Sequence, residues 1–318
     1  MNAPSRPVVR LVGLGNIGFR HLQGLSRMAE EIAIEGLDVD EAAVARAREE
    51  WRNIPFAQGR FSSPEEISSP ADLTVLATSA AGREALLQRH LDIGSRQFLL
   101  EKVVFTEPDA FGRAEQALEA VGAVAYVNTA RRLWPLHRKI KAMADAAKTP
   151  VSLEVVGRNL GLACNGVHFI DLLQMVSGRA DISTAFAEIS TPWASKRPGY
   201  YEVWGDVTFE GGDSSLRLSV QPDGPEKPSM RLKLGDREYV VDEASGMVTA
   251  DGDVVVDAGR APYQSELSVE YARPMLGRLP PALPSLSESA KAHAALFESI
   301  RPAFENAGLM NGQQIPIT

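Results

Sequence analysis

A glycine pattern near the N-terminus constrains the fold more than any other feature of this sequence. The letters GLGNIG at residues 13–18 follow a short apolar run, residues 8–12, and open a segment with helical periodicity. In a strand–turn–helix unit of this kind, each glycine has a separate task. Gly13 permits the tight turn, Gly15 lets the backbone approach a pyrophosphate, and Gly18 lets the helix pack closely on the strand. The pattern therefore predicts a dinucleotide-binding unit, with the phosphates at the helix N-terminus.

An acidic residue stands where such a unit needs one. Asp38 ends the second predicted strand, 20 residues after Gly18, where the ribose-binding carboxylate of these folds lies. A carboxylate there accepts hydrogen bonds from ribose hydroxyls and repels a 2′-phosphate, and the next residue is Val39 rather than arginine. The sequence therefore predicts NAD as the cofactor in preference to NADP. We expect Asn16 and Ile17, which follow the glycine turn, to line the same site.

Strand and helix signals alternate through the first part of the chain. Short apolar runs such as residues 73–76 and 98–100 are typical of buried parallel strands, and helical patterns lie between them. This alternation predicts an α/β Rossmann domain with a doubly wound parallel sheet. Later strands, such as residues 216–220, alternate in polarity and are separated by glycine and aspartate turns. They predict an antiparallel or mixed sheet with one wetter face.

The change of pattern also predicts two domains. A chain of 318 residues is long enough for two compact domains. We place the boundary between Asn128 and Pro150, and assign residues 1–128 to the dinucleotide-binding domain. Residues 129–318 then form an α+β domain that binds substrate and supports oligomerisation.

The composition excludes several other classes of protein. The chain has 33 Lys and Arg against 41 Asp and Glu, a net charge of −8 that is poorly suited to binding nucleic acid. Cys164 is the only cysteine, and the five histidines lack ligand-like spacing, so we expect neither disulfides nor a bound metal. No apolar run reaches the roughly 20 residues of a membrane helix. Residues 1–7 lack the apolar core of a signal peptide, so we expect a cytoplasmic protein that does not bind membranes.

Two further features carry reactive side chains. Glu101 and Lys102 follow the strand at residues 98–100, at the carboxyl end, where open α/β sheets bind ligands. A lysine there is placed for proton transfer, although a surface Glu-Lys pair is the alternative. Further along, Cys164 and His168 are four residues apart and would share a helix face. That histidine is either catalytic or simply a packed or solvated side chain.

The ordered set of motifs resembles the glucose-fructose oxidoreductase, inositol dehydrogenase and MocA family of NAD(P)-dependent oxidoreductases. The resemblance implies a Rossmann domain followed by an α/β domain with a large open, mostly antiparallel sheet, whose broad face often serves oligomerisation, here as a homodimer or homotetramer. It implies hydride transfer between nicotinamide and the hydroxyl or keto carbon of a sugar, sugar nucleotide or cyclitol. The residues that carry it are Gly13, Gly15, Gly18, His21, Asp38, Ala77, Thr78, Ser79, Glu101, Lys102, Asn128, Arg131, Arg132 and the segment 166–171.

The resemblance also implies individual roles. Lys102 matches the lysine of the family's EKP motif, which assists proton transfer at the substrate hydroxyl. His168 matches the histidine of the family's DxxxH pattern, often the general base. Thr78, Ser79 and Glu101 match positions that line the nicotinamide half of the cofactor. The substrate is expected between the two domains, over the nicotinamide.

Two departures from the family pattern affect the expected substrate site. Val103 stands where the family usually has proline, and Cys164 where it usually has aspartate. A neutral thiol cannot hold the charge of a carboxylate, although the neighbouring Asn165 could supply a hydrogen bond. Arg132 matches a family position near the substrate, so the expected substrate-binding residues are Lys102, Arg132, Cys164, Asn165 and His168.

Two rival functions stay open, and the departure at Cys164 motivates the first of them. The first is a sensor or regulatory protein that binds NAD but has lost turnover. The second is a reductase of a non-sugar acceptor such as a tetrapyrrole or diketone, which would need a deeper, more apolar pocket. Retention of both Lys102 and His168 favours an enzyme over the sensor.

Overall fold

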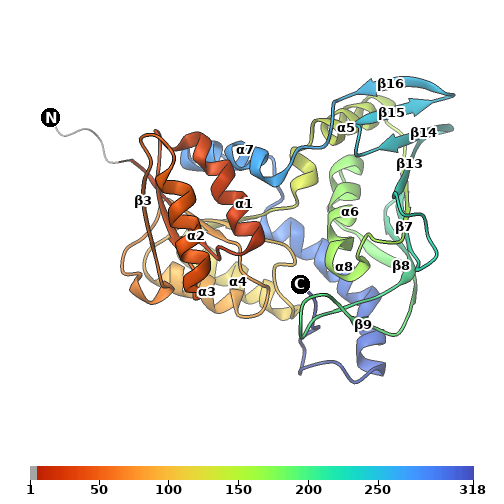
Figure 1. Cartoon of the computed structure of the whole chain (residues 1–318). Helices are drawn as coiled ribbons and strands as arrows, with labels where there is room; N and C mark the ends of the chain where they lie inside the picture. Colours follow the sequence, from red (N-terminus) through yellow and green to blue (C-terminus); the bar gives the residue numbers. More distant parts are fainter. Residues whose placement is uncertain (1–5) are drawn as a thin grey trace. The chain divides into compact units, whose positions relative to one another are not determined.

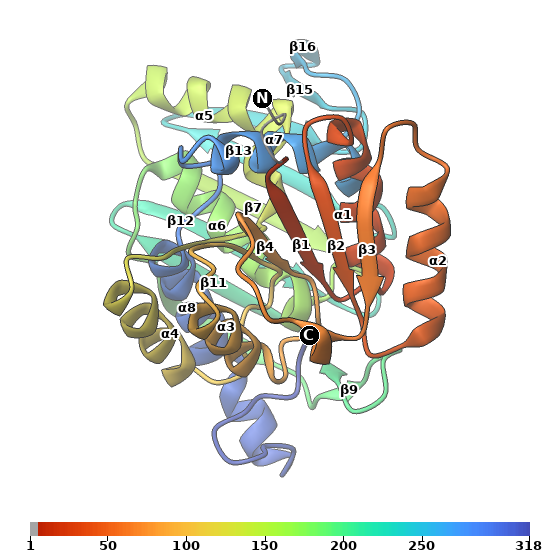
Figure 2. The same cartoon turned by 90° about the vertical axis from the view of Figure 1, so that its left-hand side faces the viewer.

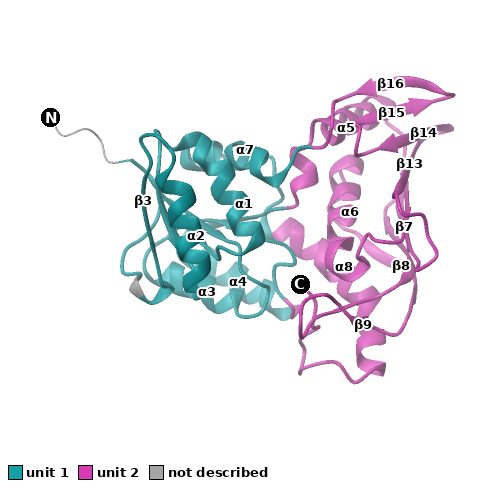
Figure 3. Cartoon of the chain, viewed as in Figure 1, with its two compact units in different colours: residues 1–105, 109–128, 262–286 teal, residues 106–108, 129–261, 287–318 magenta. Residues whose placement is uncertain are grey.

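The chain folds into two compact units (Figures 1 and 3). The structure is a computed structural model that describes residues 6–318, except for the side chain of Glu66. Unit 1 comprises the chain up to Phe105 together with residues 109–128 and 262–286, and unit 2 comprises residues 106–108, 129–261 and 287–318.

Unit 1 is therefore not one continuous stretch of sequence. The chain changes unit after residue 128, but residues 262–286 return to unit 1. The predicted domains, residues 1–128 and 129–318, did not include this return. The physical reason is helix packing, because α7 (Gln264–Leu276) lies against α1 (Asn16–Leu25).

A six-stranded parallel sheet forms the centre of unit 1. Its strand order is β3-β2-β1-β4-β5-β6, and every neighbouring pair is parallel. The order reverses beside β1, and such a reversal opens the crevice in which doubly wound sheets bind ligands. This confirms the predicted fold class, and Figure 2 shows β1, β2 and β3 side by side. The strands are β1 (Val8–Val12), β2 (Ala33–Leu37), β3 (Gln58–Ser62), β4 (Leu73–Leu76), β5 (Gln97–Leu100) and β6 (Val124–Val127).

Helices connect these strands and cover the sheet. The helix α1 packs against α2 and α7, while α3 packs against α4. Asp40 begins α2 by accepting a 2.9 Å hydrogen bond from the N–H of Ala42, which satisfies one of the helix's unpaired donors. Besides α1 and α7, unit 1 contains α2 (Glu41–Arg52), α3 (Arg83–Asp92), α4 (Asp109–Ala120) and the 3₁₀ turns at Ser26–Met28 and Pro64–Glu66.

Unit 2 is built on an eight-stranded sheet. Its order is β16-β15-β14-β13-β7-β12-β11-β8, and only the β7–β12 pair is parallel. The large, mostly antiparallel sheet implied by the resemblance is thus confirmed. Its strands are β7 (Val151–Gly157), β8 (Ser183–Ile189), β11 (Gly205–Gly211), β12 (Ser214–Val220), β13 (Ser229–Leu234), β14 (Arg237–Asp242), β15 (Met247–Ala250) and β16 (Asp253–Asp257).

The alternation of polarity gives this sheet one apolar and one polar face. In β7, Leu153 and Val155 are buried, while Glu154 points to the other face and binds Arg217 of β12 at 2.9 Å. The helix α6 contacts β7, β11 and β12. The remaining elements of unit 2 are η3 (Ala130–Leu133), α5 (Pro135–Ala147), α6 (Leu162–Ser177), α8 (Leu286–Asn306) and the short pair β9 (Trp193–Ala194) and β10 (Tyr201–Glu202).

Candidate active site

The glycine turn has the close packing that the sequence predicts for it. Gly13 has a φ of +92°, and its N–H donates a 2.8 Å hydrogen bond to the carbonyl of Leu37. A Cβ atom on Gly13 would lie 2.8 Å from the carbonyl carbon of Ala77, and one on Gly18 would overlap the carbonyl oxygen of Gly13. The tight turn therefore requires glycine at both positions.

The middle glycine faces open space. A Cβ atom on Gly15 would meet no other atom within 4 Å. Gly15 begins α1 without a side-chain cap, and the first turn, with Asn16 and Ile17, is exposed and carries no acidic residue. The first N–H groups of α1 therefore remain open to a ligand, and a helix N-terminus in this condition suits a phosphate group.

Asp38 lies directly beside this turn. Its carboxylate accepts a 2.6 Å hydrogen bond from the N–H of Leu14 and a 2.9 Å bond from the N–H of Asp40. A carboxylate has about four acceptor positions, so two bonds to backbone leave capacity for ribose hydroxyls. Thr78 and Ser79 follow β4, and Thr78 reaches the same turn, since a Cβ on Gly13 would lie 2.9 Å from its backbone nitrogen.

The sequence reasoning missed an arginine at this place. Arg46 of α2 is exposed, donates a 2.8 Å hydrogen bond to the carbonyl of Leu14, and lies 4.7 Å from the ring centroid of Phe19. The prediction considered only the residue after Asp38, whereas the helical fold of α2 brings in a cation from eight positions further on. Arg46 and Asp38 both bond to Leu14, so the turn has a charge of each sign beside it.

Glu101 is anchored within unit 1 by buried polar groups. Its side chain is 5% exposed, its Oε1 lies 2.7 Å from His21 Nε2, and Asn128 donates a 2.5 Å hydrogen bond to the same oxygen. Burial by itself would raise the pKa of Glu101, but the hydrogen bond and charge of His21, the bond from Asn128 and the charge of Lys102 lower it overall. The carboxylate thus stays ionised and holds the end of β5 in place.

This anchor extends to residues far away in the sequence. The hydroxyl of Tyr271, from α7, lies 2.8 Å from His21 Nδ1, and Gln264 accepts a 3.1 Å hydrogen bond from Asn128. The sequence indicated His21 only as one of the residues that carry the family resemblance. Nothing in the sequence indicated Tyr271 or Gln264, because their contacts arise from the return of the chain to unit 1.

Lys102 occupies the position predicted for it, after the carboxyl end of β5. Its side chain is half-buried, and the peptide bond between Lys102 and Val103 is cis. Lys102, Glu101, Thr78 and the glycine turn all belong to the same unit and follow the carboxyl ends of its strands. The predicted cofactor residues are thus gathered at one edge of the parallel sheet.

The remaining predicted residues lie in unit 2, on α6 and η3. The helix α6 contains Cys164, Asn165 and His168. Glu202 of β10, 6% exposed, accepts hydrogen bonds from the N–H groups of Ala163 at 2.5 Å and Cys164 at 3.3 Å. This carboxylate caps the N-terminus of α6, a role that sequence reasoning did not assign.

Cys164, Asn165 and His168 share the first turns of the helix that Glu202 caps. Asn165 donates a 2.7 Å hydrogen bond to the carbonyl of Leu160, which fixes the loop that leads into α6. Cys164 is half-buried, with its Sγ 3.8 Å from the carbonyl oxygen of Gly161. His168 is half-buried one turn later on the same helix.

Arg132 binds a buried carboxylate in the same unit. Asp171 of α6 is 0% exposed, and Arg132 approaches it with Nε at 2.9 Å and Nη2 at 2.8 Å from Oδ1. The guanidinium is only 13% exposed. Burial raises the pKa of Asp171, although the charge and hydrogen bonds of Arg132 act in the opposite direction. The pair links η3 to α6.

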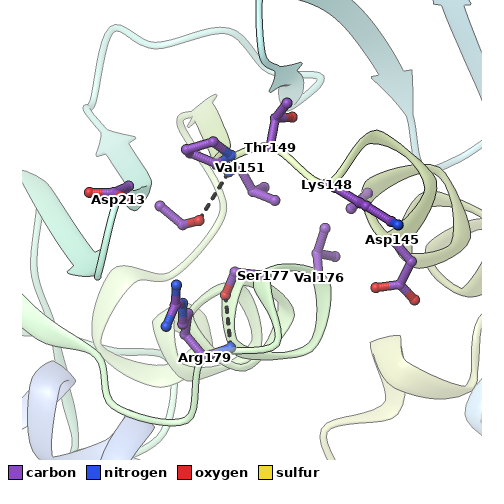
Figure 4. Close-up of a pocket in the computed structure, with 11 residues that line it drawn as sticks. Asp145, Lys148, Thr149, Val151, Val176, Ser177, Arg179 and Asp213 are labelled. Carbon is purple, nitrogen blue, oxygen red and sulfur yellow. Dashed lines mark hydrogen bonds between the residues drawn. The ribbon is translucent and has the colours of Figure 1, made fainter.

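A separate cavity of about 410 Å³ lies in unit 2, near the C-terminal ends of α5 and α6 (Figure 4). Its lining includes Asp145, Lys148, Ser177, Arg179 and Asp213, and none of the predicted site residues. The charged side chains in this lining are all exposed, namely Asp145, Lys148, Arg179 and Asp213. It is a polar surface hollow outside the candidate site.

The described part of the chain contains neither a metal-binding cluster nor a membrane-spanning helix. Within residues 6–318, no three or more His, Cys, Asp or Glu side chains are grouped so that they could hold a metal ion. Over the same residues, no helix combines the length and the apolar character needed to cross a membrane.

Comparison with known proteins identifies relatives in structure only. The sequence matches none of the family models and none of the curated proteins with which it was compared. UDP-N-acetylglucosamine 3-dehydrogenase GnnA from Acidithiobacillus ferrooxidans has a TM-score of 0.72 at 15% identity, over 96% of this chain and 99% of that one. The WlbA dehydrogenase from Chromobacterium violaceum, in complex with NADH and UDP-GlcNAcA, has a TM-score of 0.70 at 18% identity, over 95% and 97%.

A third solved structure is named for a different cofactor from the NADH bound in WlbA. It is a candidate NADPH-dependent oxidoreductase from Desulfitobacterium hafniense, with a TM-score of 0.75 at 14% identity, over 96% of this chain and 97% of that one. These matches extend along nearly the whole of each chain. They show that this protein has the fold of a group of nicotinamide-dependent dehydrogenases and oxidoreductases.

Proposed function

We propose that the chain is an NAD-dependent oxidoreductase of the glucose-fructose oxidoreductase, inositol dehydrogenase and MocA family. One observation carries the proposal: the uncapped N-terminus of α1 and the open space at Gly15 lie beside Asp38. That combination provides N–H donors for a pyrophosphate and an acceptor for ribose hydroxyls in one place. The solved structures with the same fold support the assignment, since WlbA is in complex with NADH.

The residues present fit a nicotinamide dinucleotide. The glycine turn and α1 would hold the pyrophosphate, Asp38 would hold the adenosine ribose, and Thr78 and Ser79 would line the nicotinamide half. When bound, the cofactor supplies the hydride acceptor or donor, and the protein supplies orientation and proton transfer.

The proton transfer is assigned to Lys102 and His168. During oxidation of an alcohol, the hydroxyl proton must leave the oxygen as the carbon loses hydride, and a neutral amine or imidazole accepts it. During reduction, the ammonium or imidazolium returns that proton to the carbonyl oxygen. Lys102 has the stronger support, since its neighbour Glu101 is held by buried hydrogen bonds at the edge where the glycine turn lies.

The proposed substrate is a sugar, sugar nucleotide or cyclitol that carries a secondary hydroxyl or keto group. GnnA is named as a dehydrogenase of UDP-N-acetylglucosamine, and WlbA is in complex with UDP-GlcNAcA. UDP-sugars are therefore the first compounds to test.

A spectrophotometric assay tests this function. The purified protein is mixed with NAD and a panel of UDP-sugars, free sugars and cyclitols, and with NADH and the matching keto compounds. We expect at least one member to change the absorbance of the reduced cofactor at 340 nm. Tight NADH binding without turnover in either direction would instead favour the sensor, while turnover with diketones alone would favour the non-sugar reductase.

The choice between NAD and NADP gives a separate prediction. Asp38→Asn keeps an oxygen that can accept the N–H of Leu14 but removes the charge that repels a 2′-phosphate. We expect the NAD-to-NADP ratio of kcat/KM to fall by about tenfold or more, which corresponds to about 1.4 kcal/mol. Adding Arg46→Met should reverse part of this gain for NADP, because Arg46 supplies the nearby cation. An unchanged ratio in Asp38→Asn would remove Asp38 from cofactor selection.

A further inference from the structure

We infer that Arg83 is a positioning residue for Lys102, because it holds the backbone on both sides of the lysine. Arg83 is the first residue of α3 and is only 1% exposed. Its Nη1 lies 2.5 Å from the carbonyl oxygen of Glu101, 2.5 Å from that of Val103 and 2.8 Å from that of Val104. The residue before Lys102 and the two after it are thus bound to one guanidinium nitrogen.

The second nitrogen of the same guanidinium reaches another strand. Nη2 of Arg83 donates to the carbonyl of Thr78, which follows β4. One side chain therefore ties the segment after β4 to the segment after β5, and these are neighbouring parallel strands. This is the edge of the sheet where Lys102 and the predicted nicotinamide-side residues lie.

Arginine is the side chain suited to this task. A planar guanidinium presents five N–H donors in a rigid fork, whereas a lysine ammonium is a compact charge on a flexible stem. The segment around Lys102 is neither helix nor strand, so its buried carbonyls need partners from elsewhere. Burial of a charge is costly unless the charge is hydrogen-bonded, and the four carbonyls provide those bonds.

The lysine backbone is consequently held from two directions. Arg83 binds the main-chain carbonyls around it, while His21 and Asn128 bind the side chain of Glu101. The side chain of Lys102 is the half-buried group in this fixed stretch. Fixing the backbone limits the directions in which the ammonium can point, and an error of about 1 Å in such a group can cost on the order of 100-fold in rate.

The expected effect of Arg83 on catalysis rests on the proposed function. The test therefore includes one measurement, hydrogen–deuterium exchange, that does not require turnover of a substrate. Arg83→Ala removes the guanidinium, and the peptide over residues 101–106 should exchange its amide hydrogens faster in hydrogen–deuterium exchange. Methylguanidinium added to the variant should slow that exchange again, whereas methylammonium should not. The matched control is Arg96→Ala, since Arg96 also donates to two carbonyls, at 3.0 Å and 2.8 Å, but at the start of β5.

The second readout is activity with a substrate found in the panel assay. We expect Arg83→Ala to lower kcat by on the order of 100-fold while the Kd for NADH changes little, and methylguanidinium to restore part of kcat. Arg83→Lys should retain more activity than Arg83→Met, because it keeps a cationic donor. Circular dichroism and thermal melting select the variants that remain folded, and Arg83→Lys serves as the measurable variant if Arg83→Ala does not fold.

The outcomes separate the two claims. Unchanged exchange over residues 101–106 in a folded Arg83 variant overturns the positioning role. If the wild type turns over a substrate, an Arg83 variant with the same kcat as wild type also overturns it. If the wild type turns over no substrate, the proposed function fails, and the exchange result alone decides whether Arg83 holds the segment. Faster exchange with guanidinium rescue then still supports that holding role.

Discussion

Replacement of Lys102 by methionine is expected to lower kcat by about 10²–10⁴-fold, the usual contribution of a positioned general acid or base. Methionine keeps the length and apolar stem of lysine, so the packing around this half-buried side chain is preserved. The Kd for NADH should change little, because the glycine turn and Asp38 hold the other end of the cofactor. Steady-state kinetics and an NADH fluorescence titration measure the two quantities separately.

A second variant separates proton transfer from simple charge. Lys102→Arg keeps the positive charge but cannot lose its proton at accessible pH. If Lys102 transfers a proton, the arginine variant should be nearly as impaired as the methionine variant. The matched control is Lys141→Met, which removes another half-buried lysine, one that pairs with Asp145 on α5. Wild-type turnover in Lys102→Met would remove Lys102 from the mechanism.

Replacement of Arg132 by methionine is expected to cause the largest loss of stability, about 3–5 kcal/mol at pH 8. The variant would leave the carboxylate of Asp171, which is fully buried, without its bidentate partner. Removal of one member of a buried ion pair leaves an uncompensated charge in a medium of low polarity. Urea denaturation followed by tryptophan fluorescence measures the change.

The pH dependence of this loss has a definite sign. Burial already raises the pKa of Asp171 in the folded wild type. A carboxyl with a raised folded pKa favours the folded state most below its ordinary pKa of about 3.9, and this contribution is lost as pH rises through the folded pKa. Without Arg132 the folded pKa rises further, so the loss caused by Arg132→Met should be larger at pH 8 than at pH 4.5.

A double variant provides the control for this prediction. Arg132→Met combined with Asp171→Met replaces the ion pair by two apolar side chains, a change that is often nearly neutral. We expect the double variant to recover most of the stability lost in Arg132→Met. An equal loss at both pH values, or no recovery in the double variant, would contradict the role assigned to the pair.

The sequence predicted those parts of the molecule that depend on local patterns. The apolar runs at residues 73–76 and 98–100 became β4 and β5, and the alternating run at residues 216–220 lies within β12. Glycine turns and strand periodicity are set by neighbouring residues, so a single chain reveals them. The segment that contains Cys164 and His168 is helical, so their four-residue spacing places them on one face of α6.

The partners of the site residues depend on contacts between distant segments. Glu101 is held by His21, 80 positions earlier in the sequence. The capping carboxylate of α6 comes from Glu202, which no helix-start pattern near residue 162 could indicate. Arg83 opens α3 as an ordinary charged residue in sequence, and only the fold buries its guanidinium among four carbonyls.

Titration of the Gly15→Val variant with NADH tests most directly whether the glycine turn binds a dinucleotide. The Cβ of the new side chain would meet nothing within 4 Å beyond its chain neighbours, so the fold should tolerate it, yet the side chain would occupy the surface assigned to the pyrophosphate. Gly112→Val is the matched control, because Gly112 of α4 is likewise exposed and open. We predict that wild type and Gly112→Val bind NADH with similar Kd values, while Gly15→Val keeps its melting temperature and loses detectable binding. Equal NADH affinity in Gly15→Val and wild type, or no binding by the wild type, would contradict a dinucleotide site at the glycine turn.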